Sequence, residues 1–135
     1  MPSALTDYNI FKTNLYSPTS GTVLMTSNTS EDLLPPKTDK NNPAGNYIIL
    51  KVENTDNAVL LAHLMKDSIR VKQGDRIEAG QLIGKVGNSG NTSEPHLHIH
   101  CVKINDRNDF LFDAKSVPMV FDNSFLVRNS VYESE

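Results

Sequence analysis

Three of the four histidines occupy alternate positions, as His96, His98 and His100. Side chains at i, i+2 and i+4 of a β-strand point to one face, so the segment PHLHIH predicts three imidazoles on one face and two aliphatic side chains on the other. Imidazole is the commonest nitrogen ligand of zinc, and a strand can hold two or three rings at fixed separation. This pattern favours a metal or catalytic site that uses at least two of these histidines over a row of surface histidines.

The fourth histidine, His63, stands at the end of the apolar run AVLLAHL. This run predicts a strand of the kind that would lie beside the histidine strand. A lone histidine in such a place is usually structural. His63 is therefore a candidate site residue only if the fold brings it to His96.

Two polar segments predict loops near the histidines. The connection KVGNSGNTSEPH has two glycines, which permit positive φ, and its exposed amides either line a cleft beside the histidine strand or form an ordinary turn. The longer stretch NTSEDLLPPKTDKNNPA, residues 28–44, holds three of the seven prolines. Loops of this length are functional rims in some proteins and mobile insertions in others.

The pattern of the whole chain predicts an all-β protein. Short β-branched and aromatic runs between turn residues predict strands, and no segment has apolar residues at helical spacing over a dozen positions. The predicted strands are Gly21–Met25, Asn46–Val52, Ala58–Leu64, Gln81–Val86 and His96–Val102, with a final one ending near Phe121. We expect a single-domain antiparallel β-sandwich or barrel-like sheet, with an open groove floored by the histidine strand and rimmed by residues 28–44 and 87–95.

Length and composition narrow the function classes. The 135 residues suffice for one domain, with an expected core over residues 7–121 and a tail over 122–135. A net charge of -3 provides no basic surface, so we expect no binding to nucleic acid.

No apolar run approaches the ~18 residues that span a bilayer, and the start MPSALTDYNIF lacks the charged and then apolar segments of a signal peptide. The single cysteine, Cys101, is expected to be a small buried strand residue.

The segments GNYIILKVENTDNAVLLAHL and IRVKQGDRIEAGQLIGKVGNSGNTSEPHLHIH together resemble the lysostaphin-type (LytM-like) zinc metallopeptidases, which cut peptides of bacterial peptidoglycan. A glycine-asparagine strand, a histidine-leucine strand end, a glycine-rich hairpin and a histidine-x-histidine strand occur in the family's order. The resemblance implies the duplicated hybrid motif fold, a peptidoglycan endopeptidase activity, a Zn²⁺ cofactor, and a location in the cell envelope or outside the cytoplasm.

The resemblance also implies roles for particular residues. His98 is the second histidine of the pair and matches a zinc ligand, and Asp7, in TDYNIF, matches the carboxylate ligand. His63 and His96 match the catalytic partners that flank the attacking water, deprotonating it or stabilising the oxyanion. The family has a further histidine ligand upstream of the aspartate, whereas Ser3 stands four residues before Asp7 here.

Two explanations fit the missing histidine: the sequence begins after it, or the protein is a degenerate member that binds without cutting. Asp7 and His98 alone fall short of the three protein ligands of catalytic zinc sites. His100, on the predicted face of His98, is a hypothetical substitute ligand.

Two rival functions remain open from the sequence. One is a non-catalytic peptidoglycan-binding or regulatory module, which keeps the groove and loses the metal. The other is a phosphocarrier or a biotinyl or lipoyl carrier, because IRVKQGDRIEAGQLIG also resembles their hybrid motif. The carrier interpretation explains the fold but not the HLHIH strand, and Lys66 lacks the setting of a carrier lysine.

Overall fold

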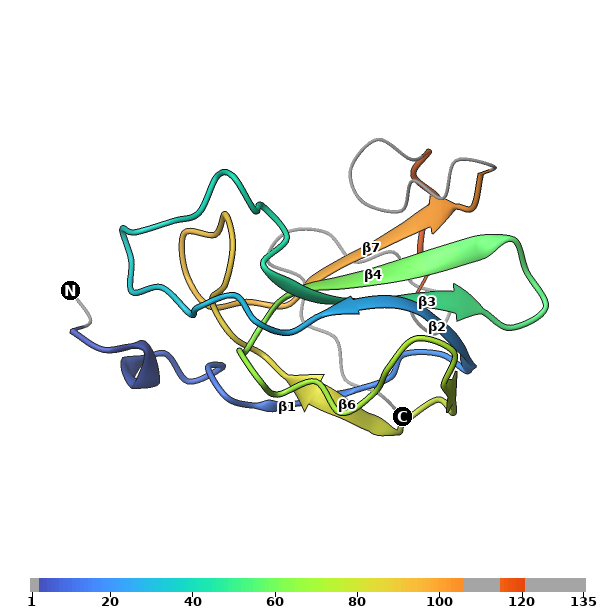
Figure 1. The fold of residues 1–135 in the computed structure, drawn as a ribbon, viewed down its shortest axis with the longest axis horizontal. Coiled ribbons are helices and arrows are strands. Elements are labelled where there is room, and N and C mark those ends of the chain that lie inside the picture. The colour runs from blue at the N-terminus through green and yellow to red at the C-terminus, as the bar shows by residue number, and fades with distance from the viewer. Residues whose placement is uncertain (1–2, 106–114, 121–135) are drawn as a thin grey trace.

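The computed structural model describes residues 3–105 and 115–120 and has the predicted all-β antiparallel fold (Figure 1). A five-stranded sheet has the order β5-β2-β3-β4-β7, and a two-stranded sheet pairs β1 with β6. A three-residue 3-10 turn, η1 (Leu5–Asp7), comes before the first strand. The strands are β1 (Asn14–Tyr16), β2 (Gly21–Ser27), β3 (Asn46–Val52), β4 (Asn57–Leu64), β5 (Arg76–Ile77), β6 (Leu82–Lys85) and β7 (His98–Lys103).

The predicted strands agree with the structure except at the histidines and the chain end. The bounds of β3 are those predicted, and β2, β4 and β6 differ from the prediction by one or two residues at their ends. The prediction that the histidine strand begins at His96 is wrong, because β7 begins at His98. Near the predicted final strand, Ser116 forms an isolated bridge with Val102. Phe121 and the predicted tail, 122–135, lie outside the described residues.

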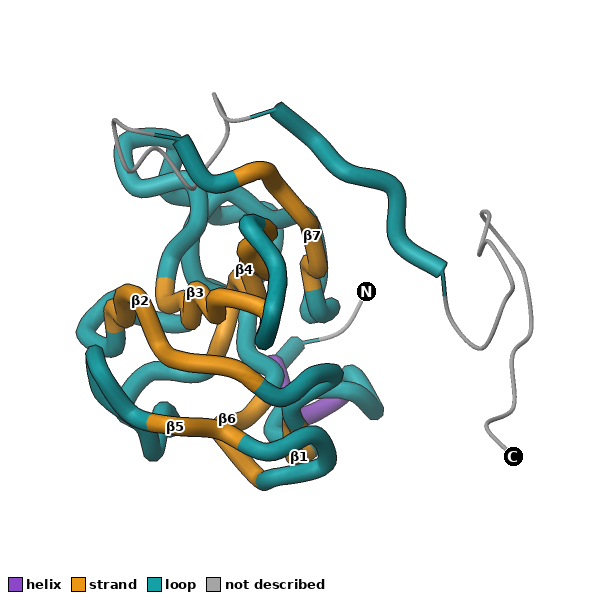
Figure 2. Tube along the Cα trace, turned by 90° about the vertical axis from the view of Figure 1, so that its right-hand side faces the viewer, coloured by secondary structure: helices purple, strands orange, loops and turns teal. Residues whose placement is uncertain are grey.

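The main hydrophobic core lies between the two sheets (Figure 2). Leu15 and Ile83 come from the two-stranded sheet and pack against the five-stranded one. Cys101 of β7 is buried in this core, as predicted. Burying one aliphatic side chain of this core contributes about 1.5–3 kcal/mol to the free energy of folding. The core therefore holds β4 and β7 in place from one side. The remaining core members are Val23, Ile48, Leu50, Val59, Leu61, Leu64 and Ile77.

A β-bulge interrupts β4 at its end. Ile48 of β3 pairs with Leu61, but Asn46, two residues earlier, pairs with Leu64, three residues later. The extra residue falls at His63, whose φ of 62° is in the left-handed region. As a result Leu64 joins Leu61 in the main core, and His63 turns to the opposite face, a change that bulges commonly produce next to active sites.

The two predicted rim loops contact each other through backbone hydrogen bonds. Leu33 N donates to Asn88 O at 3.0 Å, and Asp39 N donates to Gly90 O, also at 3.0 Å. Asn91 N donates to Pro43 O at 2.9 Å. The 28–44 loop is therefore fixed to the 87–95 loop at several points. Within the described ranges, no helix is long and apolar enough to cross a membrane.

Truncating the core beneath β4 should destabilise the fold far more than truncating the same residue type on the rim. Leu61 is fully buried, whereas Leu34 is 38% exposed. We expect Leu61→Ala to lower the free energy of unfolding by about 2–5 kcal/mol and Leu34→Ala to lower it by less than about 1 kcal/mol, both measured by urea unfolding. Equal losses in the two variants would contradict the position of the core.

Candidate active site

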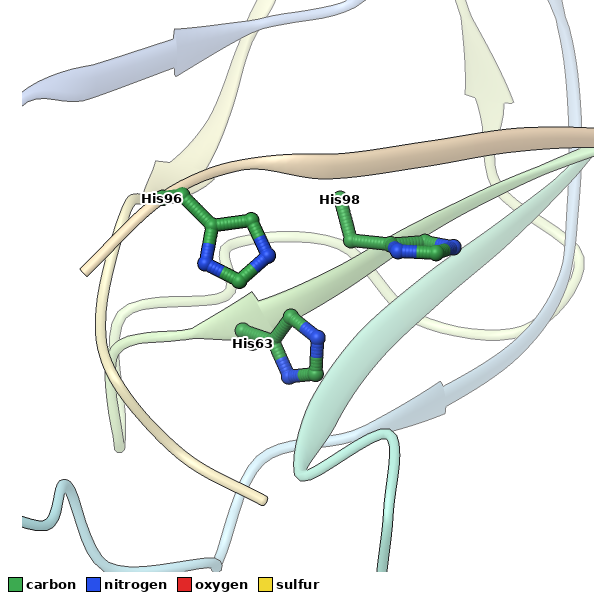
Figure 3. Close-up of side chains that lie close together, drawn as sticks. All are labelled: His63, His96 and His98. Carbon is green, nitrogen blue, oxygen red and sulfur yellow. The ribbon is translucent and has the colours of Figure 1, made fainter. Parts of the chain in front are cut away.

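Three imidazole rings meet where β4 ends and β7 begins (Figure 3). His63 comes from the end of β4, His98 is the first residue of β7, and His96 lies just before that strand. One ring nitrogen from each lies within 4.8 Å of the others. The ring centroid of His63 is 4.8 Å from that of His96 and 5.7 Å from that of His98. The fold thus brings together all three histidines that the sequence named as site residues.

Two of these rings line a pocket beside the rim loops. A pocket of about 320 Å³ is lined by His63 and His98, with Pro43 from the 28–44 loop and Asn91 from the 87–95 loop. Ala62, the neighbour of His63, pairs with His98 across the β4–β7 ladder. The ladder ends there because the bulge at His63 follows, and this explains why His96 lies outside the strand.

The ring of His63 is fixed by a backbone carbonyl. Its Nδ1 lies 2.9 Å from Ser89 O. Since a carbonyl oxygen only accepts, Nδ1 carries the hydrogen, and the neutral ring has its lone pair on Nε2. A carbonyl in this position sets the tautomer and orientation of histidines that bind metals or move protons.

The ring of His96 is fixed in the same way. Its Nδ1 lies 2.8 Å from Glu94 O and 3.1 Å from Thr92 Oγ1. The Thr92 hydroxyl donates to Glu94 O at 2.8 Å. Nδ1 of His96 therefore donates, and Nε2 again has the lone pair. Two of the three rings share one tautomer.

Burial keeps two of these rings neutral. The side chain of His63 is 6% exposed, and desolvation lowers its pKa from 6.5 to about 4, despite an opposing effect of its hydrogen bond to Ser89. Desolvation also lowers the pKa of His98, with His100 and His96 adding to the effect. Neutral imidazole is the form that binds metals, so both rings have a lone pair available for a metal ion near pH 7.

The structure places Asp7 and His100 outside this cluster. Asp7 lies exposed in η1, where its Oδ2 accepts hydrogen bonds from Ser3 N at 2.9 Å and from Ala4 N at 3.0 Å. Nε2 of His100 lies 2.9 Å from Ser116 Oγ. Neither belongs to the group of three histidines, the only such group found among the described residues. The role of Asp7 as a ligand stays a prediction.

The sequence did not identify the carbonyl groups that orient the rings. Ser89 and Glu94 lie in the segment KVGNSGNTSEPH, whose composition indicated a connection beside the site. The expectation that its amides are exposed is wrong for residues 87–90, which are buried. Gly87 N donates to His63 O at 3.1 Å, and Asn88 N donates to Asp32 Oδ1 at 2.8 Å. These amides stabilise the loop instead of facing a ligand.

Residues 6–110 match the family model of peptidase family M23. The peptidoglycan DD-endopeptidase ShyA of Vibrio cholerae is 33% identical to this chain over 91 residues, which are 67% of this chain and 17% of ShyA. The chain therefore spans less than a fifth of the length of that relative.

Solved structures agree with this match. A zinc-containing peptidase from Vibrio cholerae is 27% identical, with a TM-score of 0.56 over 79% of this chain and 26% of that one. The catalytic domain of lysostaphin from Staphylococcus simulans shares the fold, with a TM-score of 0.57 and 24% identity over 78% of this chain and 68% of that one. The resemblance to lysostaphin-type peptidases is confirmed, and the chain belongs to peptidase family M23.

Proposed function

We propose that this chain is a zinc-dependent endopeptidase that hydrolyses peptide bonds in bacterial peptidoglycan, in the cell envelope or outside the cytoplasm. The observation that carries the proposal is the cluster of His63, His96 and His98, whose ring nitrogens lie within 4.8 Å of one another and two of which line a pocket beside the rim loops. Family membership and the similarity to ShyA, a peptidoglycan DD-endopeptidase, support the substrate class.

The donor chemistry of the site suits zinc. Neutral imidazole is among its usual ligands, and burial holds His98 in the neutral form. In this proposal His98 and Asp7 hold the ion. The chemistry that zinc supplies when bound is polarisation of the peptide carbonyl and a lower pKa for the attacking water.

His63 and His96 transfer the protons in this proposal. Their Nδ1 atoms donate to carbonyl groups, so Nε2 of each ring is the atom that exchanges a proton with the reactants. A ring that takes the proton of the attacking water can return it to the leaving amine or stabilise the oxyanion while it is charged. An extended peptide would lie over the histidine pocket, beside the rim loops, and strand-like pairing is a common mode of recognising such a peptide.

A degenerate binding module is the second candidate. It is favoured by Ser3, which stands where the family has its upstream histidine, and by Asp7, which lies outside the histidine cluster. Such a module would keep the groove and bind peptidoglycan without cutting it. Zinc affinity and hydrolysis separate the two candidates.

Zinc should bind the metal-stripped protein one to one, through Asp7 and His98. We expect Asp7→Ala and His98→Ala each to weaken binding by at least about tenfold in titration calorimetry, since each removes a ligand. His100→Ala tests the hypothetical substitute ligand; because that ring is hydrogen-bonded to Ser116 and lies outside the cluster, we expect a smaller loss than in His98→Ala.

Two results would change this assignment. Loss of binding in His100→Ala would make His100 a ligand. Undetectable binding in the wild-type chain would favour the degenerate module. In that case Ser3→His, which supplies an imidazole at a position whose backbone N–H contacts Asp7, should create measurable affinity, whereas Ser3→Ala should not.

Peptidoglycan hydrolysis should depend on both proton-transferring histidines. We expect the protein to release new amino termini from purified peptidoglycan, to lose this activity with a chelator and to regain it with zinc. His63→Ala and His96→Ala should each lower kcat by about 10²–10⁴-fold, the usual contribution of general acid–base catalysis. Their zinc affinity should stay close to that of the wild type. Pull-down of intact peptidoglycan without hydrolysis would contradict the enzyme and support the binding module.

The metal-free protein should lose stability as the medium becomes acidic. The unfolded chain binds a proton at His63 near its ordinary pKa of 6.5, but the folded protein does so only near 4, so the unfolded state holds more protons between these values. Lowering the pH through this window should cost up to about 3 kcal/mol, measured by urea unfolding. His63→Gln should flatten the dependence; parallel curves for variant and wild type would contradict it.

A further inference from the structure

The Ser89 side chain is hydrogen-bonded to both β3 and β4 close to His63. Ser89 is fully buried, and its Oγ donates to Leu64 O at 2.7 Å and accepts from Asn46 N at 2.9 Å. Its carbonyl oxygen lies 2.9 Å from Nδ1 of His63. One residue thus contacts β3, the residue that follows His63, and the imidazole ring itself.

The backbone at His63 needs such support. Left-handed φ is strained for a residue with a Cβ, so the bulge persists only where its surroundings hold it. His63 N donates to Ala44 O at 3.0 Å, and His63 O accepts from Gly87 N at 3.1 Å. The next carbonyl, that of Leu64, is held by Ser89 Oγ together with Nδ2 of Asn46 at 3.0 Å.

Packing leaves Ser89 little freedom to move. A Cβ built on Gly45 would lie 2.4 Å from Oγ of Ser89, so the glycine backbone is in close contact with it. Asn46 is also fully buried, and its side chain is fixed by Ser30, whose N–H donates to Asn46 Oδ1 at 2.8 Å. The Ser89 carbonyl is therefore held at a fixed place relative to β3 and β4.

We propose that the Ser89 hydroxyl is a positioning group for His63: by fixing residue 89 to Asn46 and Leu64, it holds the carbonyl that sets the orientation and tautomer of the His63 ring. Ser89 does not line the pocket of His63 and His98, so it acts through His63 and not on a ligand. The catalytic importance of this role rests on the proposed function. The effect of the Ser89 hydroxyl on the orientation of the His63 ring is independent of that function.

The test compares two buried serines that make the same kinds of hydrogen bond. Ser68 Oγ donates to Met65 O at 2.7 Å and accepts from Lys85 N at 3.1 Å, but Ser68 makes no hydrogen bond to His63 or Leu64. Ser89→Ala and Ser68→Ala therefore remove matched hydroxyl groups. Ser89→Ala leaves the carbonyl acceptor of residue 89 in the chain, so the experiment isolates the hydroxyl.

The readout is the ¹⁵N and ¹H spectrum of the imidazoles in the metal-free, folded proteins near pH 7. The wild type should show His63 as one tautomer with an observable Nδ1 proton, and Ser68→Ala should keep this signature. In Ser89→Ala we expect loss of the Nδ1 proton signal and a mixture of tautomers. An unchanged His63 signature in folded Ser89→Ala would overturn the proposal, as would the same loss in Ser68→Ala.

If Ser89→Ala does not fold, Ser89→Cys provides the same test, because sulfur fills a similar space but is only a weak hydrogen-bond group. This spectrum needs neither zinc nor substrate. If the tautomer changes but the wild-type protein never cuts peptidoglycan, the proposed function fails and the positioning role stands. If the wild type cuts peptidoglycan and the tautomer is unchanged, only the positioning role fails.

Discussion

The site depends on one strained residue, His63, whose left-handed backbone conformation forms the bulge at the end of β4. Such a conformation costs about 1–3 kcal/mol, and hydrogen bonds to Ala44 and Gly87 on either side hold it in place. The bulge has two effects. It turns the imidazole away from the core and toward His98, and it ends the ladder between β4 and β7, so that His96 approaches from a loop.

Burial stabilises the core and also keeps the imidazole rings of His63 and His98 neutral. Aliphatic side chains on both faces of β4 lose water and stabilise the fold, and at the end of the strand the same loss of water disfavours the charged form of His63. The backbone carbonyls of Ser89 and Glu94 then determine which nitrogen carries the hydrogen. Two main-chain carbonyls of the 87–95 loop thus orient two of the three clustered histidines.

Much of the fold followed from local sequence patterns. The run that forms β3 is unbroken between Gly45 and a polar turn, and its predicted bounds match the structure. Strands β1 and β5 were not predicted, because they have only three and two residues and are too short to show a periodic pattern. Each is defined by its pairing with a strand distant in sequence, β6 for β1 and β2 for β5. The predicted start of β7 was wrong because histidines alternate with other residues from His96 onward, so the sequence pattern shows no break there. The pairing of β7 stops at His98 because of the bulge in β4, which the sequence of β7 does not reveal.

Part of the candidate site was also predictable from the sequence. The alternating histidines indicated His96 and His98, together with His100, which lies outside the cluster, and the strand-end position made His63 a candidate. The family resemblance added Asp7, whose role as a ligand stays a prediction. The orienting carbonyls were not accessible, because a main-chain oxygen exists at every position and only the folded loop selects Ser89 and Glu94.

The attachment of the 28–44 loop has a consequence for protein engineering. Leu33 and Asp39 are held by backbone hydrogen bonds to the 87–95 loop, while the segment between them, with Pro35 and Pro36, lines a neighbouring pocket. Backbone anchors do not depend on side-chain identity. Residues 34–37 are therefore suitable positions for combinatorial libraries, in which one wall of the neighbouring pocket is diversified while the histidines stay fixed.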